Sequence, residues 1–538
     1  MSKDMDKAFF GHPAGLSTLF FTEMWERLSY YGARTFLAIY MVTPVALGGR
    51  GMSDGATGLV MALYMSSVYL LSLPGGWIAD RFMGQRKAVT VGGVGIALGN
   101  AMLALPIDSL FLPGLAVIAF GTGFLKPNIS TLVGQLYKPD DVRRNAGYTI
   151  YYMGINIGAG AAPLVGMFIA QSPSFRAMLA DHGIDPNMCW KIGFAVPAVG
   201  MVFGLIQYFI GYKKLGTAGI QPTIPTDKVK ANRDVTVLKT IAASLVVLIG
   251  GGILIDQFVY ELSGELIGNI FSVGLLIAAV AVFVGFFKGA RDHNERTRVA
   301  AMLPLFIGAI AFFALFEQAS TTMSLYAERI VDRHLLGFYV PASFYQFWNA
   351  IFIVILAAPF AAMWLKLGKA GKEPTSVNKF GIGMIFAALS FCVMLPTLAQ
   401  AETAQCLTKE GCNLVSPYYL VVFYFVSTLS ELFISPVGLS SMFGLAPQRL
   451  AGMVMGTWFL ATAIGNYIAG RAASISEGHG YGYLFKLLIV SALVIAAALF
   501  AVAPRIKRMM ANPKASAPAD HSQKAEPDPL PAARTVED

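Results

Sequence analysis

The stretch TEMWERLSYYGAR (Thr22–Arg34) decides which fold this sequence can adopt. It lies inside an apolar segment at about residues 14–46, and about 20 residues are enough to span a bilayer. On a helix, at about 100° per residue, positions 23, 27, 30 and 34 lie within about 60° of one another. Glu23, Arg27 and Arg34 occupy three of these positions, so the helix carries a charged stripe. Because such a stripe cannot face lipid, we expect it to line a polar cavity. The segment carries four charged side chains: Glu23, Glu26, Arg27 and Arg34.

The composition of the whole chain also indicates a membrane protein. Of the 538 residues, 56% are hydrophobic and only 13% are charged, whereas soluble domains are about 25% charged. The mean hydropathy is +0.60. These values argue against a soluble enzyme, a disordered scaffold and a nucleic-acid-binding domain. Fourteen apolar segments follow one another at about 14–46, 54–80, 87–106, 109–137, 142–170, 190–212, 237–259, 265–288, 299–328, 344–367, 379–399, 417–445, 450–474 and 481–504.

The spacing of these segments predicts two similar halves. Residues 1–213 hold six segments, residues 299–510 hold six more, and residues 214–298 hold two. A pair of six-helix bundles with a binding site between them is the plan of major facilitator transporters. We therefore predict an all-α membrane protein with a major facilitator fold and 14 transmembrane helices, two of them inserted. The tail, residues 511–538, is rich in Ala, Pro and charge and is expected to be disordered.

The basic residues orient the predicted helices. Of the 40 Lys and Arg residues, 29 lie on the side of the amino terminus, 8 on the opposite side and 3 within helices. Because loops rich in Lys and Arg stay in the cytoplasm, we expect both termini, including the tail, to be cytoplasmic. The expected location is the inner (plasma) membrane.

Further charges lie at membrane depth. Lys126 is in GTGFLKPNIS, Glu317 in FEQAS and Glu431 in STLSELFISPVG. Together with the first segment they give three cations and four carboxylates. One carboxylate therefore lacks a cation, and a buried carboxylate without a counter-charge favours its protonated form, which suits a proton-coupled carrier. Two structural explanations of these charges are the alternatives to a functional role. The charges could form ion pairs that only hold helices together, or each could lie alone at a helix end.

Several motifs together resemble the proton-dependent oligopeptide transporter (POT) family of the major facilitator superfamily. The first segment contains E-x-x-E-R-x-x-Y-Y over Glu23–Tyr31. Two departures are Phe313, where the family often has Trp, and Ala350 after Asn349, where it often has Pro; either changes which side chains fit. The other matching stretches, in family order, are Gly75–Lys87, Gly121–Ser130, Tyr151–Gly160, Phe316–Ser320 and Ser430–Ser440.

The resemblance implies a proton-coupled symporter that imports di- and tripeptides by alternating access. For proton coupling it implies that Lys126 pairs with Glu23 and Glu26. It also implies that Arg34 pairs with Glu317 across the two halves and closes the outside. The peptide-binding residues that it implies are Arg27, Tyr30 and Lys126 for the carboxylate, Asn156, Asn349 and Glu431 for the amino group, and Tyr69, Phe313 and Trp458 for side chains.

Other functions remain as alternatives or are disfavoured. The same fold could carry another small anion such as nitrate, another zwitterion, a peptide-like drug or a sugar. A membrane enzyme would need paired histidines, metal ligands or a catalytic triad at membrane depth, and a channel would need repeated filter loops. We expect no cofactor other than the coupling proton, no metal, no nucleic-acid partner, a lipid bilayer around the protein, and a monomer. A disulfide between Cys406 and Cys412, in one predicted outer loop, is left open.

Overall fold

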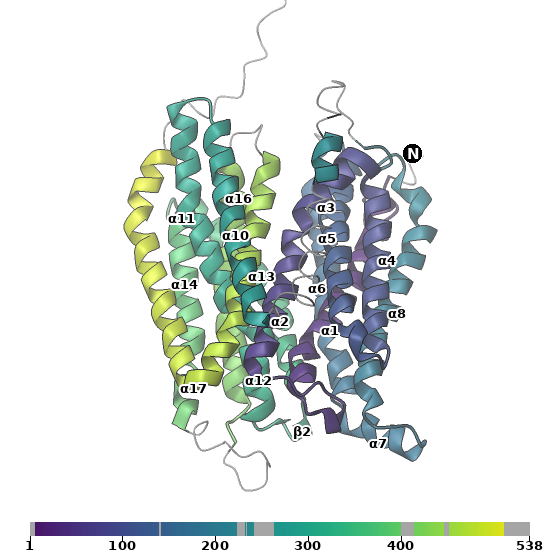
Figure 1. Ribbon diagram of the computed structural model, residues 1–538. Coiled ribbons are helices and arrows are strands. Elements are labelled where there is room, and N and C mark those ends of the chain that lie inside the picture. Colours follow the sequence, from purple (N-terminus) through teal and green to yellow (C-terminus); the bar gives the residue numbers. More distant parts are fainter. Residues whose placement is uncertain are drawn as a thin grey trace, which may run out of the picture.

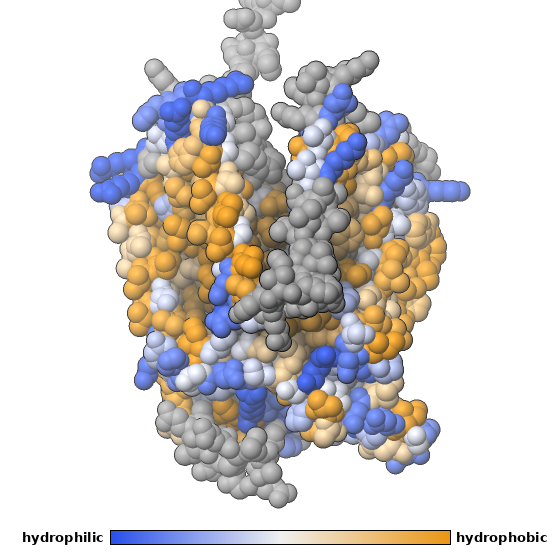
Figure 2. Space-filling model, viewed as in Figure 1, coloured by the Kyte–Doolittle hydropathy of each residue, from blue (hydrophilic) through white to orange (hydrophobic). Residues whose placement is uncertain are grey.

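The computed structural model describes residues 6–138, 141, 143–222, 232, 234–240, 263–399, 414–445 and 451–510. Within these residues, long helices stand side by side in two bundles (Figure 1). The outer surface carries an apolar band with polar residues above and below it, as expected for a protein that spans a bilayer (Figure 2).

The first bundle is formed by the amino-terminal part of the chain. Helix α2 (Asp54–Leu70) is capped by Ser53, whose hydroxyl accepts a hydrogen bond from the backbone N–H of Ala56. The α2 span continues through α3 (Ser72–Ile78) and a π-helical turn (Ala79–Met83). The other helices of this bundle are α1 (Gly15–Val42), α4 (Gln85–Ala104), α5 (Phe111–Gln135), α6 (Arg144–Val165), the short α7 (Pro173–Asp181) and α8 (Met188–Ile210).

The second bundle is formed by the carboxyl-terminal part, with α10 (Gly264–Gly289) beside it. Asp292 and Thr375 cap the starts of α11 (His293–Phe316) and α14 (Ser376–Cys392) with their side-chain oxygens. The range of α17 (Ala451–Met510) contains two spans, and Gly480 between them has a φ of 79°, which glycine adopts easily. The elements are α11 (His293–Phe316), α12 (Thr322–Arg329), β1 (His334–Leu335), β2 (Phe338–Tyr339), α13 (Phe347–Lys369), α14 (Ser376–Cys392), α16 (Tyr418–Leu445) and α17 (Ala451–Met510).

The all-α prediction is confirmed, and each predicted segment but one coincides with a described helix. The exception is 237–259, because only its first residues lie within the described part of the chain. Residues 450–474 and 481–504 were predicted as two helices. Both lie within the range of α17, and the non-helical backbone of Gly480 separates them. The predicted tail at 511–538 and the pair Cys406 and Cys412 lie outside the described residues.

Small residues allow close packing inside each bundle. A Cβ atom added at Gly92 would lie 2.6 Å from the carbonyl oxygen of Gly121, and one added at Gly121 would lie 2.6 Å from that of Gly92. Helices α4 and α5 therefore touch backbone to backbone. This is the use that small residues have in transmembrane bundles, where van der Waals packing drives association.

The two bundles meet at the end of the molecule that carries Asp54, which the charge distribution predicts to be outside. Here α2 leans from the first bundle towards α12 and α17 of the second (Figure 1). Asp54 accepts two hydrogen bonds from Arg329, at 2.5 and 2.6 Å. Further inward, a Cβ atom added at Gly470 would lie 2.5 Å from both the carbonyl oxygen of Gly58 and the backbone nitrogen of Ala62. The backbones of α2 and α17 are thus in contact.

This contact generates a prediction for Gly470→Ala. The added methyl group meets backbone atoms that cannot move aside, so α2 and α17 must separate, and overpacking of this kind destabilises by about 1–3 kcal/mol. The melting temperature of the purified protein in detergent should fall. Gly478→Ala, in the same helix, is the matched control because a Cβ atom there meets nothing within 4 Å. Equal melting temperatures for the two variants would contradict the close contact.

Candidate functional site

The charged stripe of α1 lies inside the first bundle, where Arg27 pairs with two carboxylates. Its Nε atom lies 3.1 Å from Oε1 of Glu23 and also pairs with Glu26. All three side chains are buried. Arg27 Nη2, Glu23 Oε2 and Glu26 Oε1 have no hydrogen-bond partner. The cluster is therefore neutralised only in part and retains groups that can form new bonds.

The second ion pair of α1 joins the two bundles. Arg34 pairs with Glu317, and its Nη2 donates a further hydrogen bond of 2.6 Å to Oγ of Ser320. Both acceptors lie in the 3₁₀ turn Glu317–Ser320, into which the chain passes when α11 ends at Phe316. The predicted ion pair between Arg34 and Glu317 is thus present in the structure. Arg34 and Glu317 are only 3% and 5% exposed, so each charge depends mainly on the other for its stabilisation.

Two tyrosines separate these ion pairs along α1. The guanidinium carbon of Arg27 lies 5.5 Å from the ring centre of Tyr30 and 5.8 Å from that of Tyr31. For Arg34 the corresponding distances are 5.7 and 5.6 Å. All four distances fit cation–π contacts, which favour a charged guanidinium at this depth. Tyr30 is buried, whereas Tyr31 is partly exposed.

Lys126 does not form the ion pair with Glu23 and Glu26 that the family resemblance implies. Its Nζ lies 4.2 Å from the ring centre of Tyr69, and among the described residues its side chain has no ion pair or hydrogen bond. The two glutamates pair instead with Arg27, which lies on the same helix. Lys126 is half-buried and is therefore a cation without a carboxylate in this conformation.

Glu431 is the opposite case, a carboxylate without a cation. It lies on α16, and its Oε2 accepts a hydrogen bond of 3.0 Å from Nδ2 of Asn349 on α13. The same Nδ2 atom donates to Oγ1 of Thr428, one turn before Glu431, also at 3.0 Å. No Lys, Arg or His of the described chain lies within ion-pair distance of Glu431, and its side chain is only half-buried.

A cavity of about 160 Å³ lies between the bundles and contains part of the predicted site. It brings together Arg34, Glu317, Asn156, Asn349 and Glu431. Its wall also contains residues that the sequence analysis did not select for peptide binding, from α1, α6, α11, α13 and α16: Tyr31, Tyr152, Phe316, Ile353 and Tyr424.

Tyr152 is a residue that helical spacing could have found. It lies one turn before Asn156 on α6, and Nδ2 of Asn156 donates a hydrogen bond of 2.9 Å to its carbonyl oxygen. Residues four apart share a helix face, so both face the cavity. No comparable signal exists for Phe316 or Ile353, because an apolar side chain inside an apolar helix does not stand out from its neighbours.

The remaining predicted site residues do not line this cavity. Arg27 and Tyr30 are buried in the first bundle, and Lys126 contacts Tyr69. Phe313 and Trp458 contact each other edge to face, with ring centres 5.6 Å apart. The predicted peptide-binding residues therefore fall into separate groups in the structure. One group surrounds Glu431, and the others lie nearer Arg27, Lys126 and Trp458. The roles of all these residues stay predictions.

Comparison with known proteins identifies what this chain is similar to. The model of the POT family matches residues 86–481. A protein named di-/tripeptide transporter from Lactococcus lactis is 32% identical over 517 residues, which cover 94% of this chain and 98% of that protein.

Solved structures of the same family are also similar to this chain. The crystal structure of a peptide transporter POT in complex with sulfate matches with a TM-score of 0.82 and 37% identity, over 95% of this chain and 99% of that one. The structure of a POT family transporter in complex with 5-aminolevulinic acid matches with a TM-score of 0.81 and 32% identity, over 93% and 98%. Both similarities extend over both bundles.

The buried ion pair between Arg34 and Glu317 generates a prediction about stability. Glu317→Ala leaves a buried guanidinium without its counter-charge, and breaking such a pair costs about 3–5 kcal/mol. The double variant Arg34→Met with Glu317→Ala removes both charges and should recover much of that loss. Melting temperatures in detergent measure both effects.

The control is the surface pair of Arg50 and Asp108, in which the Asp108 side chain is 86% exposed. Asp108→Ala should change the melting temperature little, since water solvates both separated charges. A Glu317→Ala variant as stable as Asp108→Ala would contradict a buried, mutually dependent pair.

Proposed function

The chain belongs to the proton-dependent oligopeptide transporter family, and from this membership we propose that it is a proton-coupled symporter that imports di- and tripeptides by alternating access. One observation supports this proposal most strongly. Lys126 and Glu431 are opposite charges at membrane depth, on opposite halves of the molecule, and neither has a charged partner among the described residues. Buried charges need partners, so a ligand that carries both charges fits.

A short peptide is a ligand of that kind, because it carries a carboxylate at one end and an ammonium group at the other. We propose that Lys126, with Arg27 and Tyr30, holds the carboxylate. Glu431 would then hold the amino group, with Asn156 and Asn349 as neutral hydrogen-bonding groups. A peptide bound in this way contacts both bundles and favours the state in which they are close together.

The side chains of the peptide need apolar walls that accept many shapes. Tyr69, Phe313 and Trp458 are proposed for this role, and Phe316 and Ile353 of the cavity wall add to it. Sites lined mainly by aromatic and apolar groups, with few polar groups to fix orientation, discriminate weakly between apolar side chains. Phe313 is smaller than the tryptophan that the family often has at this position, so the space left for a peptide side chain is different.

Proton coupling is proposed to act through Glu317. The described ion pairs between the bundles are Arg34 with Glu317 and Asp54 with Arg329. A proton on Glu317 removes its charge, which weakens the attraction to Arg34 and permits the Asp54 end to open. Under the predicted orientation this end faces outside, both termini are cytoplasmic, and a high outer proton concentration favours opening. We propose a monomeric, non-enzymatic carrier in the inner membrane with no cofactor other than the proton.

A second candidate substrate is a zwitterion that is not a peptide. The similar POT family structure holds 5-aminolevulinic acid, which also carries an amino and a carboxylate group. Lys126 and Glu431 would match its charges as they match those of a peptide, so a carrier of a peptide-like drug or another amino acid derivative is the alternative.

Uptake into proteoliposomes tests the proposed function. With an inward proton gradient, labelled dialanine should accumulate, and a protonophore should abolish the accumulation. Unlabelled trialanine should compete, whereas free alanine should not, because its two charges are too close together to reach both poles. Competition by 5-aminolevulinic acid without competition by any peptide would instead favour the alternative.

The proposed orientation of the peptide, with its amino group at Glu431, generates a prediction for Glu431→Gln. N-acetylation removes the positive charge of dialanine, so the natural protein should bind dialanine far more tightly than N-acetyl-dialanine. Losing one partner of such a charge pair costs about 2–5 kcal/mol. Glu431→Gln should bind dialanine poorly and lose most of the difference between the two ligands, as measured by competition against labelled dialanine.

Glu477→Gln is the matched control, because Glu477 lies at the Asp54 end and accepts a hydrogen bond only from the backbone nitrogen of Gly55. This variant should distinguish the two ligands as the natural protein does. Unchanged discrimination in Glu431→Gln would place the amino group of the peptide elsewhere.

A further inference from the structure

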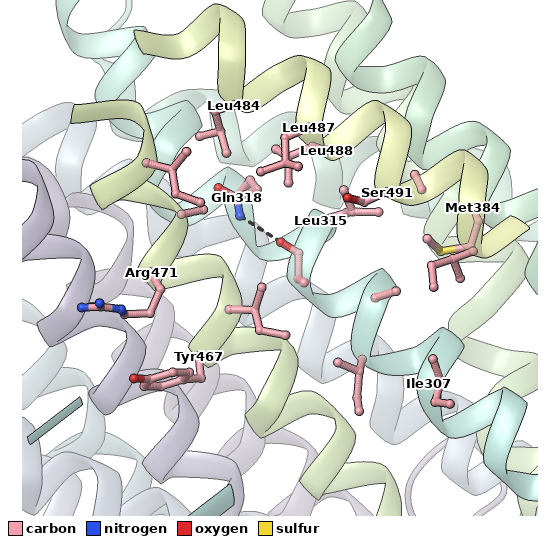
Figure 3. A pocket seen from close by; sticks show the side chains of 18 of the residues that line it. Ile307, Leu315, Gln318, Met384, Tyr467, Arg471, Leu484, Leu487, Leu488 and Ser491 are labelled. Atoms are coloured by element: carbon pink, nitrogen blue, oxygen red, sulfur yellow. Dashed lines mark hydrogen bonds between the residues drawn. The ribbon is translucent and has the colours of Figure 1, made fainter. Parts of the chain in front are cut away.

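A second cavity, of about 610 Å³, lies between α10, α11, α14 and both spans of α17 (Figure 3). None of its lining residues lines the cavity that contains Glu431. Its volume is within the roughly 300–1,000 Å³ of typical ligand pockets. Most of its wall is apolar and includes Ile307, Leu315, Met384, Leu484, Leu487 and Leu488.

This cavity is accessible from the membrane. Ile307 and Ile468 in its wall are apolar side chains that are 51% and 45% exposed. Helix α10 packs against its neighbours along one side. The Tyr467 hydroxyl donates a hydrogen bond of 2.6 Å to the carbonyl oxygen of Gly268, Leu275 in the middle of the helix is buried, and Phe283 contacts Phe306 with ring centres 5.1 Å apart. Lipid therefore has access to the apolar wall beside α10.

One edge of the cavity is polar and carries a free cation. Arg471 and Tyr467 lie one turn apart on α17 at this edge, with the leucines of the second α17 span across the cavity (Figure 3). Arg471 forms no ion pair or hydrogen bond anywhere in the described chain, and its side chain is partly exposed. An arginine on the membrane side of a bundle without a protein partner is unusual, because the charge is costly in hydrocarbon.

The depth of Arg471 is that of lipid headgroups. Its neighbour Gly470 packs against Gly58, which is one helical turn, about 5.4 Å, inward of Asp54. Asp54 pairs with Arg329 at the polar rim of the molecule. A long arginine side chain one turn inside that rim reaches the interface between the headgroups and the acyl chains.

No acid in the described part of the surrounding elements pairs with this cation. Asp54 is occupied by Arg329, and Glu477 accepts from the backbone of Gly55. Glu265, in the first turn of α10, forms no ion pair with Arg471. The partner that fits is an anion that lies at the interface and carries a long apolar chain.

We propose that this cavity binds an anionic phospholipid, with its phosphate on Arg471 and an acyl chain along the apolar wall. Guanidinium groups bind phosphate oxygens through two parallel hydrogen bonds, which gives both affinity and orientation. The bound chain would fill the space between α10 and α17 and would hold the inserted helix against the second bundle.

Native mass spectrometry of the full-length protein in detergent tests the headgroup contact. The protein is titrated with phosphatidylglycerol and with phosphatidylcholine of identical acyl chains. The natural protein should bind phosphatidylglycerol about fivefold more tightly, as one cation near an anionic headgroup provides, and Arg471→Gln should remove that preference. Lys486→Gln is the matched control, because Lys486 is an exposed cation on the same helix outside the cavity wall. An unchanged preference in Arg471→Gln would overturn the proposal.

A second pair of variants tests the acyl-chain contact. Ser491 lines the cavity, so Ser491→Trp should fill it and weaken the binding of both lipids. Val494→Trp is the control, because Val494 is 60% exposed and does not line the cavity. Equal melting temperatures of the two variants show that both are folded. If the melting temperatures differ, the lipid preference of Arg471→Gln decides whether the cavity binds the lipid. Lipid binding by Ser491→Trp equal to that of Val494→Trp would overturn the proposal, since the chain would then lie elsewhere.

Discussion

The ion pair between Arg34 and Glu317 is the constraint on which the arrangement of the two bundles depends. Both side chains are buried, so each depends mainly on the other for its stabilisation while the bundles are close together. The contact between Gly58 and Gly470 and the pair of Asp54 with Arg329 lie further towards the same end. Together they describe a molecule whose bundles are in contact at the Asp54 end and are joined across their centre by charge. A proton on Glu317 changes the balance because it removes one of the two charges.

The remaining charges at membrane depth divide into paired and unpaired groups. Arg27 pairs with Glu23 and Glu26 within α1, and these pairs do not involve the second bundle. Lys126 and Glu431 are half-buried and have no charged partner among the described residues. On this division rests the proposal that one interface responds to a proton through its paired charges and to a zwitterion through its unpaired charges.

Much of this arrangement could be predicted from the sequence, because charges stand out against apolar helices. The stripe on α1 follows from helical geometry, and the predicted pair of Arg34 with Glu317 is present. The implied pair of Lys126 with the two glutamates was wrong for this conformation, since Arg27 is closer along the same helix. The apolar cavity wall could not be predicted, because Phe316 resembles any other residue of a buried helix. The same holds for the cavity beside α10, which depends on how far apart separate helices lie.

The central claim is that the ion pair of Arg34 with Glu317 holds the Asp54 end closed until Glu317 loses its charge. Distance measurement by pulsed electron paramagnetic resonance tests it most directly. Spin labels are attached at Leu47 and Leu336, exposed positions on the two halves, in a cysteine-free protein in proteoliposomes. At neutral pH the distance distribution should be short and narrow, and Glu317→Gln should shift it to longer distances without a change in pH. A distribution that is the same in both proteins would contradict the account.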